Sequence, residues 1–249
     1  MASRSWGRDA VLTWDQFSRI AFDGGVITVS VFVMAAVLGT VLSLLFGIMG
    51  LSESRLFRGI SRIYVEVARG ASAIVLVFFA AFAAPRFIGF RTSDVSVTLF
   101  GIDVGWVFIA GAVALGINMG GYGAEVVRGG IKSIPRGQTE ASISLSLTNG
   151  QRLRYVILPQ AVMTMLPPYG NLNIEVMKGT ALVSLIGVAD MTFFARDLFN
   201  RRNFLENGPS LVVIWGTALV LYFIVSQAIA AFYRWQERRF GGRWFGGRL

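Results

Sequence analysis

The chain has 249 residues, of which 54% are hydrophobic and 15% are charged, and its mean hydropathy is +0.61. Such a composition is that of a membrane protein. The sequence contains no Cys and no His, which excludes thiol nucleophiles, disulfides, zinc sites and catalysis by an imidazole base. We therefore expect a protein that is not an enzyme and holds no metal. The net charge of +9 does not indicate nucleic-acid binding, because the basic residues lie in loops between apolar segments.

Five segments are candidates for helices that cross a bilayer, which requires roughly 20 apolar residues each. They predict an all-α polytopic membrane protein with a single transmembrane domain over residues 1–249. The second segment has a short apolar core, so its helix must extend backward past Arg69 or forward toward Phe90. The predicted spans are 24–49, 71–90, 104–127, 162–189 and 209–233.

A polar loop, residues 128–160, separates the third and fourth spans. Ile134-Pro135 and Leu158-Pro159 predict its boundaries, since the residue before a proline is disfavoured in the helical region. Between them, Thr139 can cap a helix that runs through Leu147, and Thr148-Asn149-Gly150 then predicts a break. Periodicity alone fits an amphipathic helix resting on lipid headgroups, and equally a docking element for a soluble partner.

The fourth span carries an unusual number of polar residues at membrane depth. Glu175 and Lys178 lie three residues apart and can pair on one helix face. That pair either fixes helix packing or receives a solute that carries both charges, because ionisable groups inside a membrane mark function by default. Neutral side chains that can add hydrogen bonds to a transport path, or simply join helices, are Asn118, Asn171, Asn173, Thr180 and Ser184.

The distribution of Lys and Arg predicts the orientation of the chain in the membrane. Cytoplasmic loops carry an excess of Lys and Arg. One set of loops contains fourteen of these residues and four acids, with a fifth acid, Glu125, at the adjoining end of the third span, and the opposite set contains eight of each. We therefore expect the N-terminus outside and the C-terminus in the cytoplasm. The first set is 51–70, 128–160 and 234–249, and the second is 1–23, 86–103 and 190–208.

The polar loop resembles a known motif. Glu140-Ala141-Ser142, Ser146 and the run VILP ending at Pro159 follow the spacing of the cytoplasmic EAA loop of binding-protein-dependent ABC importer permeases. The runs YVEVARG, RGGIKSIPRGQTEA and KGTALVSLIGVADMT are similar to the histidine, arginine and glutamine branch of that family, and the resemblance covers about residues 20 to 235. The family's usual glycine is Ser146 here, so we expect the turn not to rely on glycine's conformational freedom at that position.

Two further points concern the solute. Ala71-Ser72 replaces the usual Thr-Pro after the Arg-Gly turn, and with KGTALVSL this is similar to permeases for ectoine-like compatible solutes. The resemblance implies a path for a polar amino acid or a related zwitterionic solute through a multi-pass protein of the bacterial inner membrane. We expect Glu175, Lys178, Asn118, Asn171 and Thr180 to line that path.

The resemblance also implies partners. The loop is then a coupling helix that docks on an ABC ATPase dimer, while a second permease copy or a homologous permease and an extracytoplasmic solute-binding protein complete the importer. The chain lacks a phosphate-binding Gly-x-x-x-x-Gly-Lys-Ser/Thr loop, so it needs no cofactor of its own and ATP is bound by the partner subunits. The residues expected to couple to the ATPase are Arg136, Glu140, Ala141, Ser142, Ser146, Leu158 and Pro159.

The alternative from another class is a stand-alone secondary transporter or channel for a small polar solute. Such a protein predicts inverted internal repeats and coupling-ion carboxylates inside the spans. The sequence has no evident repeat, and Glu175 is the one acid deep within a predicted span. These features favour the importer permease.

Overall fold

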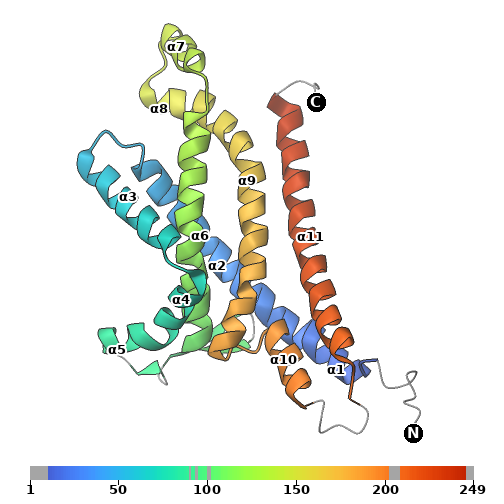
Figure 1. The fold of residues 1–249 in the computed structure, drawn as a ribbon. Helices are drawn as coiled ribbons and strands as arrows, with labels where there is room; N and C mark the ends of the chain where they lie inside the picture. The colour runs from blue at the N-terminus through green and yellow to red at the C-terminus, as the bar shows by residue number, and fades with distance from the viewer. Residues whose placement is uncertain (1–10, 90, 93–94, 100–101, 202–207, 245–249) are drawn as a thin grey trace, which may run out of the picture. The chain divides into compact units, whose positions relative to one another are not determined.

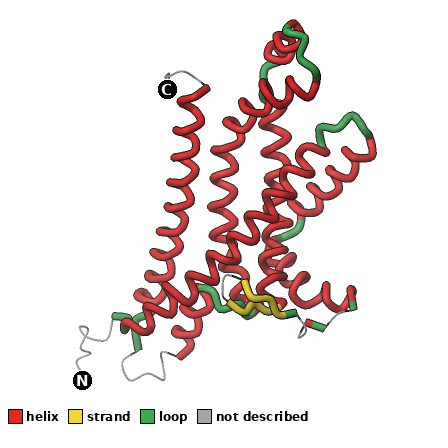
Figure 2. Tube along the Cα trace, turned by 180° about the vertical axis from the view of Figure 1, so that it is seen from behind, coloured by secondary structure: helices red, strands yellow, loops and turns green. Residues whose placement is uncertain are grey.

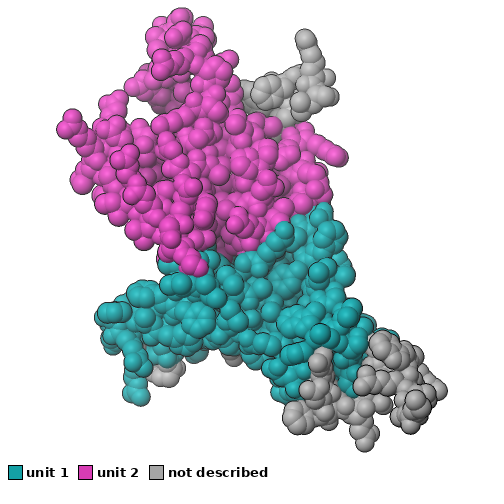
Figure 3. Space-filling view, in the orientation of Figure 1, with its two compact units in different colours: residues 1–34, 73–115, 177–227 teal, residues 35–72, 116–176, 228–249 magenta. Residues whose placement is uncertain are grey.

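The computed structural model describes residues 11–89, 91–92, 95–99, 102–201 and 208–244. Helices dominate these residues, and they form two compact units that are described separately below (Figures 1 and 3). Unit 1 comprises 1–34, 73–115 and 177–227, and unit 2 comprises 35–72, 116–176 and 228–249.

Four long helices contribute residues to both units: α2 (Gly24–Met49), α6 (Trp106–Lys132), α9 (Leu158–Gly179) and α11 (Leu211–Trp244). The shorter elements are α1 (Trp14–Ser18), η1 (Arg19–Asp23), α3 (Arg55–Gly70), α4 (Ala73–Phe78), η2 (Phe79–Ala83), α5 (Ala84–Ile88), α7 (Arg136–Ser144), α8 (Asn149–Arg152), η4 (Leu153–Ile157), η5 (Thr180–Ile186) and α10 (Met191–Arg201).

The helix α2 has the bounds of the first predicted span, and α1 and η1 extend it without a break toward the N-terminus. By length and composition, the helical stretches Trp14–Met49, Trp106–Lys132 and Leu211–Arg239 qualify as membrane spans. Two bent helix pairs bring the total to as many as five among the described residues.

The second predicted span is one of these bent pairs. The chain leaves the helical conformation at Ala71, whose φ of −80° and ψ of 136° are extended, so α3 ends there. Of the two extensions that the sequence left open, the backward one past Arg69 does not occur as a straight helix. The forward extension is seen instead, because α4, η2 and α5 carry the chain to Ile88, where Gly89 stops the helix with φ +79°.

A short hairpin precedes α6 and was not expected in an all-α chain. Strand β1 (Ser96–Leu99) pairs antiparallel with β2 (Ile102–Gly105), with Ser96 opposite Gly105 (Figure 2). β2 ends directly before Trp106, the first residue of α6.

The core of unit 1 forms where α2 meets the loop before α10. The backbone N–H of Met191 donates to the Thr28 hydroxyl at 3.1 Å, and both residues are fully buried. Gly24 permits this approach, since a Cβ on it would lie 2.8 Å from the Met191 Cα. Helices pack closely in membranes through small residues of this kind.

In unit 2, α6 packs against α2 and α3 through its glycine face. The sequence motif Gly116-x-x-x-Gly120 reads as close helix packing, and the structure confirms this. A Cβ on Gly116 would lie 3.0 Å from Leu38, and one on Gly120 would lie 2.7 Å from Leu42. The stacked rings of Phe46 and Tyr64, with centroids 3.8 Å apart, join α2 to α3.

Candidate coupling surface and transport path

The segment between α6 and α9 forms a projecting helix, α7, at one end of unit 2 (Figure 1). α7 begins at Arg136 with Pro135 as its N-cap, so the boundary predicted at Ile134-Pro135 is correct. The predicted cap at Thr139 is wrong, because the chain is already helical three residues earlier. Gln138 donates its backbone N–H to the Pro135 carbonyl at 3.0 Å, which closes the first turn.

α7 ends at Ser144 rather than at the predicted Leu147. Among the non-glycine residues that the structure describes, Ser146 alone has a positive φ, of 59°. The Leu147 N–H donates to the Ser142 carbonyl at 3.1 Å, and the Ser146 N–H donates to the Ile143 carbonyl at 2.8 Å. This is the Schellman end of a helix, which usually requires glycine. Ser146 therefore occupies the left-handed position itself, contrary to the expectation from the sequence.

After this turn, a second helical stretch begins at Asn149, within the predicted break, and it continues past Leu158-Pro159. Thr148 and Gln151 form a capping box that starts α8, and the chain then stays helical through η4 into α9. The predicted proline boundary is wrong because η4 is a π-helical turn, in which the Leu158 N–H donates to the Leu153 carbonyl. Such turns shift the hydrogen-bond register, which accommodates Pro159 in the first turn of α9.

The face that α7 presents to its surroundings is open. Glu140, Ala141 and Arg136 are exposed, and so are two apolar side chains, Ile143 at 57% and Leu145 at 73%. Both apolar side chains are available for contact with another molecule or with lipid.

The remaining residues of the predicted coupling set differ in exposure. Ser142 is buried, and its hydroxyl donates to the Thr139 carbonyl at 2.6 Å. Its small side chain allows α7 to pack closely. Leu158 is 41% exposed and Pro159 is half-buried, both in the first turn of α9.

A small apolar core holds the base of the projecting segment. Val127 of α6 packs with Ala161 and Met165 of α9, and Ile134 adds to this cluster. Gly130 allows the two helices to approach, because a Cβ there would lie 2.5 Å from the Met165 Cγ. The segment that leads into α7 is thus anchored where α6 packs on α9.

The residues predicted for the transport path fall into two groups. Asn118 donates its amide to the Ala68 carbonyl at 2.9 Å and so caps the end of α3. Thr180 is fully buried, and its hydroxyl donates to the Met177 carbonyl at 2.7 Å. Both have structural partners within the chain, which does not by itself remove them from a path.

The second group lies on one face of α9. Asn171, Glu175 and Lys178 are spaced by four and three residues, and all three are exposed. The expected ion pair between Glu175 and Lys178 does not form, since neither takes part in any ion pair of the described residues. The two side chains are therefore available to other groups.

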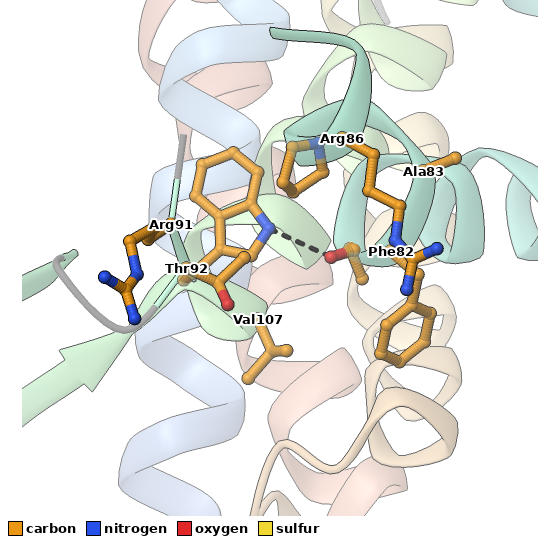
Figure 4. A pocket seen from close by; sticks show the side chains of 9 residues that line it. Phe82, Ala83, Arg86, Arg91, Thr92 and Val107 are labelled. Atoms are coloured by element: carbon orange, nitrogen blue, oxygen red, sulfur yellow. Dashed lines mark hydrogen bonds between the residues drawn. The ribbon is translucent and has the colours of Figure 1, made fainter. Parts of the chain in front are cut away.

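A cavity of about 710 Å³ in unit 1 was not foreseen from the sequence. The indole N–H of Trp106 donates to the Ala81 carbonyl in the π-helical turn η2 at 3.0 Å (Figure 4). Arg86 and Arg91 add positive charge to its lining. The lining residues come from two segments on either side of the hairpin, so no local pattern could have brought them together.

Comparisons with known proteins agree with this geometry. A family model described as "Binding-protein-dependent transport system inner membrane component" matches residues 39–242. Two relatives are named as a probable amino-acid ABC transporter permease, y4tF, of Sinorhizobium fredii and the glutamine transport system permease protein GlnP of Escherichia coli. The first is 35% identical to this chain over 92% of this chain and 93% of the relative. The second is 32% identical over 88% of this chain and 92% of the relative.

Solved structures give the same answer for the fold. A crystal structure of an amino acid ABC transporter with histidines is 28% identical, with a TM-score of 0.74, over 90% of this chain and 96% of its own. A structure of the inward-facing MetNI methionine ABC transporter matches with a TM-score of 0.68 over 92% of this chain and 99% of that one. Its sequence identity is 19%, so this match supports the fold and nothing further. These matches confirm the predicted helical permease fold. The chain belongs to the family of inner membrane components of binding-protein-dependent transport systems.

Proposed function

We propose that this chain is the permease subunit of an ABC importer that moves a polar amino acid, or a related zwitterionic solute such as ectoine, into the cell. The names of the relatives, which include amino-acid, glutamine, cystine and arginine permeases, support the solute class. ATP hydrolysis on partner subunits drives the transport, and the chain contributes the path rather than the chemistry.

The observation that carries this proposal is the exposed face of α7. Glu140 and Ala141 lie beside the exposed Ile143 and Leu145, and Ile134, just before α7, packs against the cluster that joins α6 and α9. Apolar side chains on an amphipathic helix suit a groove on another protein. A closing ATPase dimer that pulls on α7 would move α6 and α9 with it, and these helices carry the polar residues of the path.

The polar face of α9 supports a second permease in the assembly. Asn171, Glu175 and Lys178 are exposed in this single chain, although charged groups inside a membrane face other helices or water-filled cavities. Another permease copy, or a homologous permease, would cover this face and enclose a path. A carboxylate and an ammonium group along that path match the two charges of a zwitterion.

The orientation completes the proposal. The cationic loops, including the one that carries α7, face the cytoplasm, where the ATPase lies, and the N-terminus is outside. The outer side then receives solute from an extracytoplasmic binding protein. The cavity beside Trp106 and Arg86 lies in a segment assigned to that side.

The experiment that tests the function begins with affinity purification of the full chain in mild detergent from its own cells. Mass spectrometry of the copurified proteins should identify an ABC ATPase. Glu140→Lys should then abolish ATPase copurification or solute-stimulated ATP hydrolysis in proteoliposomes, because it reverses a charge on the docking face. Glu53→Lys, at an exposed acid in the loop between α2 and α3, is the matched control and should leave both intact.

Recovery of the chain without an ATPase would contradict the importer assignment and favour a stand-alone transporter. Full coupling in Glu140→Lys would remove α7 from the docking surface. Membrane insertion of each variant, followed by fractionation, separates loss of docking from loss of folding.

A further inference from the structure

A groove of about 720 Å³ in unit 2 lies between α3 and the C-terminal part of α6. We call it the cationic groove, because six basic side chains line it against two acids. These basic residues are Arg55, Arg58, Arg62, Arg69, Arg128 and Lys132. Neither the coupling surface nor the path on α9 uses any of them.

The two acids of the groove are already neutralised within it. Glu66 lies 3.9 Å from Arg62, and Glu125 accepts hydrogen bonds from Arg128 through both carboxylate oxygens. Four basic residues remain in excess. Of these, Arg69 lies over the ring of Tyr122, and the other three form no ion pair or side-chain hydrogen bond with any described residue: Arg55, Arg58 and Lys132.

The walls of the groove are firmly placed. The Tyr64 hydroxyl donates to the Ile117 carbonyl at 2.9 Å, and the Asn118 amide donates to the Ala68 carbonyl. The Ser61 hydroxyl donates to the Phe46 carbonyl at 2.7 Å. These bonds hold α3 against both α2 and α6, so the excess positive charge has a defined site rather than a mobile loop.

A second face of α3 is apolar and exposed. Leu56, Ile60, Ile63 and Val67 recur at the spacing of one helix face, and their exposed fractions lie between 43% and 69%. A phospholipid has both parts that this helix could bind, a phosphate for the basic side chains and acyl chains for the apolar face. A soluble anion would use the first and leave the second uncovered.

We propose that the cationic groove binds the phosphate headgroup of an anionic phospholipid, whose acyl chains lie along the apolar face of α3. Basic pockets between membrane helices suit such headgroups by charge. The assignment to the cytoplasmic leaflet rests on the proposed orientation, whereas binding itself does not depend on transport. The same lipid would hold α3 at the membrane surface beside the end of α6, from which the α7 segment departs.

The test is native mass spectrometry of the purified full chain titrated with phosphatidylglycerol, with phosphatidylcholine as the neutral lipid. The variant Arg55→Gln/Arg58→Gln should weaken phosphatidylglycerol binding about tenfold or more, since each basic residue near an anionic headgroup contributes to affinity. The matched control Arg152→Gln/Arg154→Gln removes two basic residues of the same side outside the groove and should bind as the wild type does. Phosphatidylcholine should bind weakly to all three proteins.

Wild-type phosphatidylglycerol binding in the groove variant would overturn the proposal and leave these residues with a role in orientation alone. A third arm adds inorganic phosphate. If phosphate displaces the lipid at a phosphate concentration close to that of the lipid, the lipid assignment is overturned in favour of a soluble anion. Retention of the lipid under a large excess of phosphate supports the phospholipid. Copurification of the ATPase is unaffected by any of these outcomes, so failure here is distinct from failure of the importer function.

Discussion

Leu147 donates its backbone N–H to the carbonyl of Ser142 across 3.1 Å, over a Ser146 that holds φ at +59°. The bond ends α7 and turns the chain toward α8. A residue with a side chain is strained in this conformation by roughly 1–2 kcal/mol, whereas glycine is not. The segment that carries α7 thus keeps its helix end at an energetic cost that a single substitution can remove.

We predict that Ser146→Gly stabilises the end of α7 by about 1 kcal/mol, because glycine adopts the left-handed conformation without strain. Hydrogen exchange at the amides of Ser146 and Leu147 should slow, and limited proteolysis near this turn should decrease. Ser144→Gly, two residues earlier and inside the helix, is the matched control and should cost about 0.5–1 kcal/mol. Equal effects of the two variants would contradict the assigned role of Ser146.

A buried carboxylate in unit 1 yields the second prediction. Asp190 is fully buried, accepts the Phe193 backbone N–H at 2.8 Å and the Tyr222 hydroxyl at 2.9 Å, and so caps α10. Asp190→Ala removes both acceptors and should destabilise the protein by about 2–3 kcal/mol. Asp190→Asn keeps one acceptor oxygen, for the Phe193 N–H, and turns the acceptor opposite the Tyr222 hydroxyl into a donor, so it should restore only part of the loss.

Thermal unfolding in detergent measures these differences. Asp197→Ala is the control, since it breaks an exposed ion pair with Arg201 at 2.9 Å and should change stability by no more than about 0.5 kcal/mol. If Asp190→Ala unfolds at the same temperature as Asp197→Ala, the cap does not stabilise α10.

The third prediction compares two neighbouring glycines at the start of α2. A Cβ on Gly24 would lie 2.8 Å from the Met191 Cα and N, where backbone cannot yield easily, and nothing lies within 4 Å of one on Gly25. Gly24→Ala should therefore destabilise by about 1–3 kcal/mol, since a close contact has to open. Gly25→Ala should be neutral or stabilising by up to about 1 kcal/mol through helix propensity.

Thermal unfolding of the two alanine variants provides the comparison, and hydrogen exchange at Met191 localises the effect. Its N–H donates to Thr28, so exchange should accelerate in Gly24→Ala alone. Similar unfolding temperatures for the two variants would mean that α2 does not approach Met191 as closely as described.

The sequence allowed the helical class, the first span and the boundary at Ile134-Pro135 to be predicted, because each depends on local signals. Apolar length predicts a span, and the residue before a proline is disfavoured in the helical region, whereas the cap expected at Thr139 placed the start of α7 three residues too late. The sequence left open whether the second span extends backward past Arg69, because the residues around Ala71 are small and do not forbid a helix, and the extended conformation of Ala71 excludes a straight helix there. The boundary predicted at Leu158-Pro159 is wrong, because the π-helical turn η4 accommodates a proline that would otherwise disfavour a continuous helix.

The site was less predictable where it depends on tertiary contacts. Tyr64 meets Ile117 from 53 residues away, and this contact sets the cationic groove. The count of basic residues in the loops predicted an orientation. It did not indicate that basic residues of α3 and α6 line one groove. The pairing of Glu175 with Lys178 was expected from spacing, yet spacing shows which groups can meet and not which rotamers they adopt.

The last prediction concerns Glu175, which is exposed on the polar face of α9 and takes no part in an ion pair of the described residues. Under the proposed function, its carboxylate helps receive the positively charged group of a zwitterionic solute. Glu175→Gln removes the charge and keeps the shape, so it should slow solute uptake into proteoliposomes about tenfold or more. The unfolding temperature and ATPase copurification should stay at wild-type values, because no internal bond is lost.

Glu53→Gln removes a carboxylate from a loop outside α9 and serves as the control for net charge, so its uptake should match the wild type. Lys178→Gln tests the opposite charge on the same face and should slow uptake in parallel with Glu175→Gln. Wild-type uptake by both α9 variants would exclude this face from the path. Loss of assembly in Glu175→Gln alone would instead assign the carboxylate to a contact with the second permease, since it forms no ion pair with the part of the chain that the structure describes.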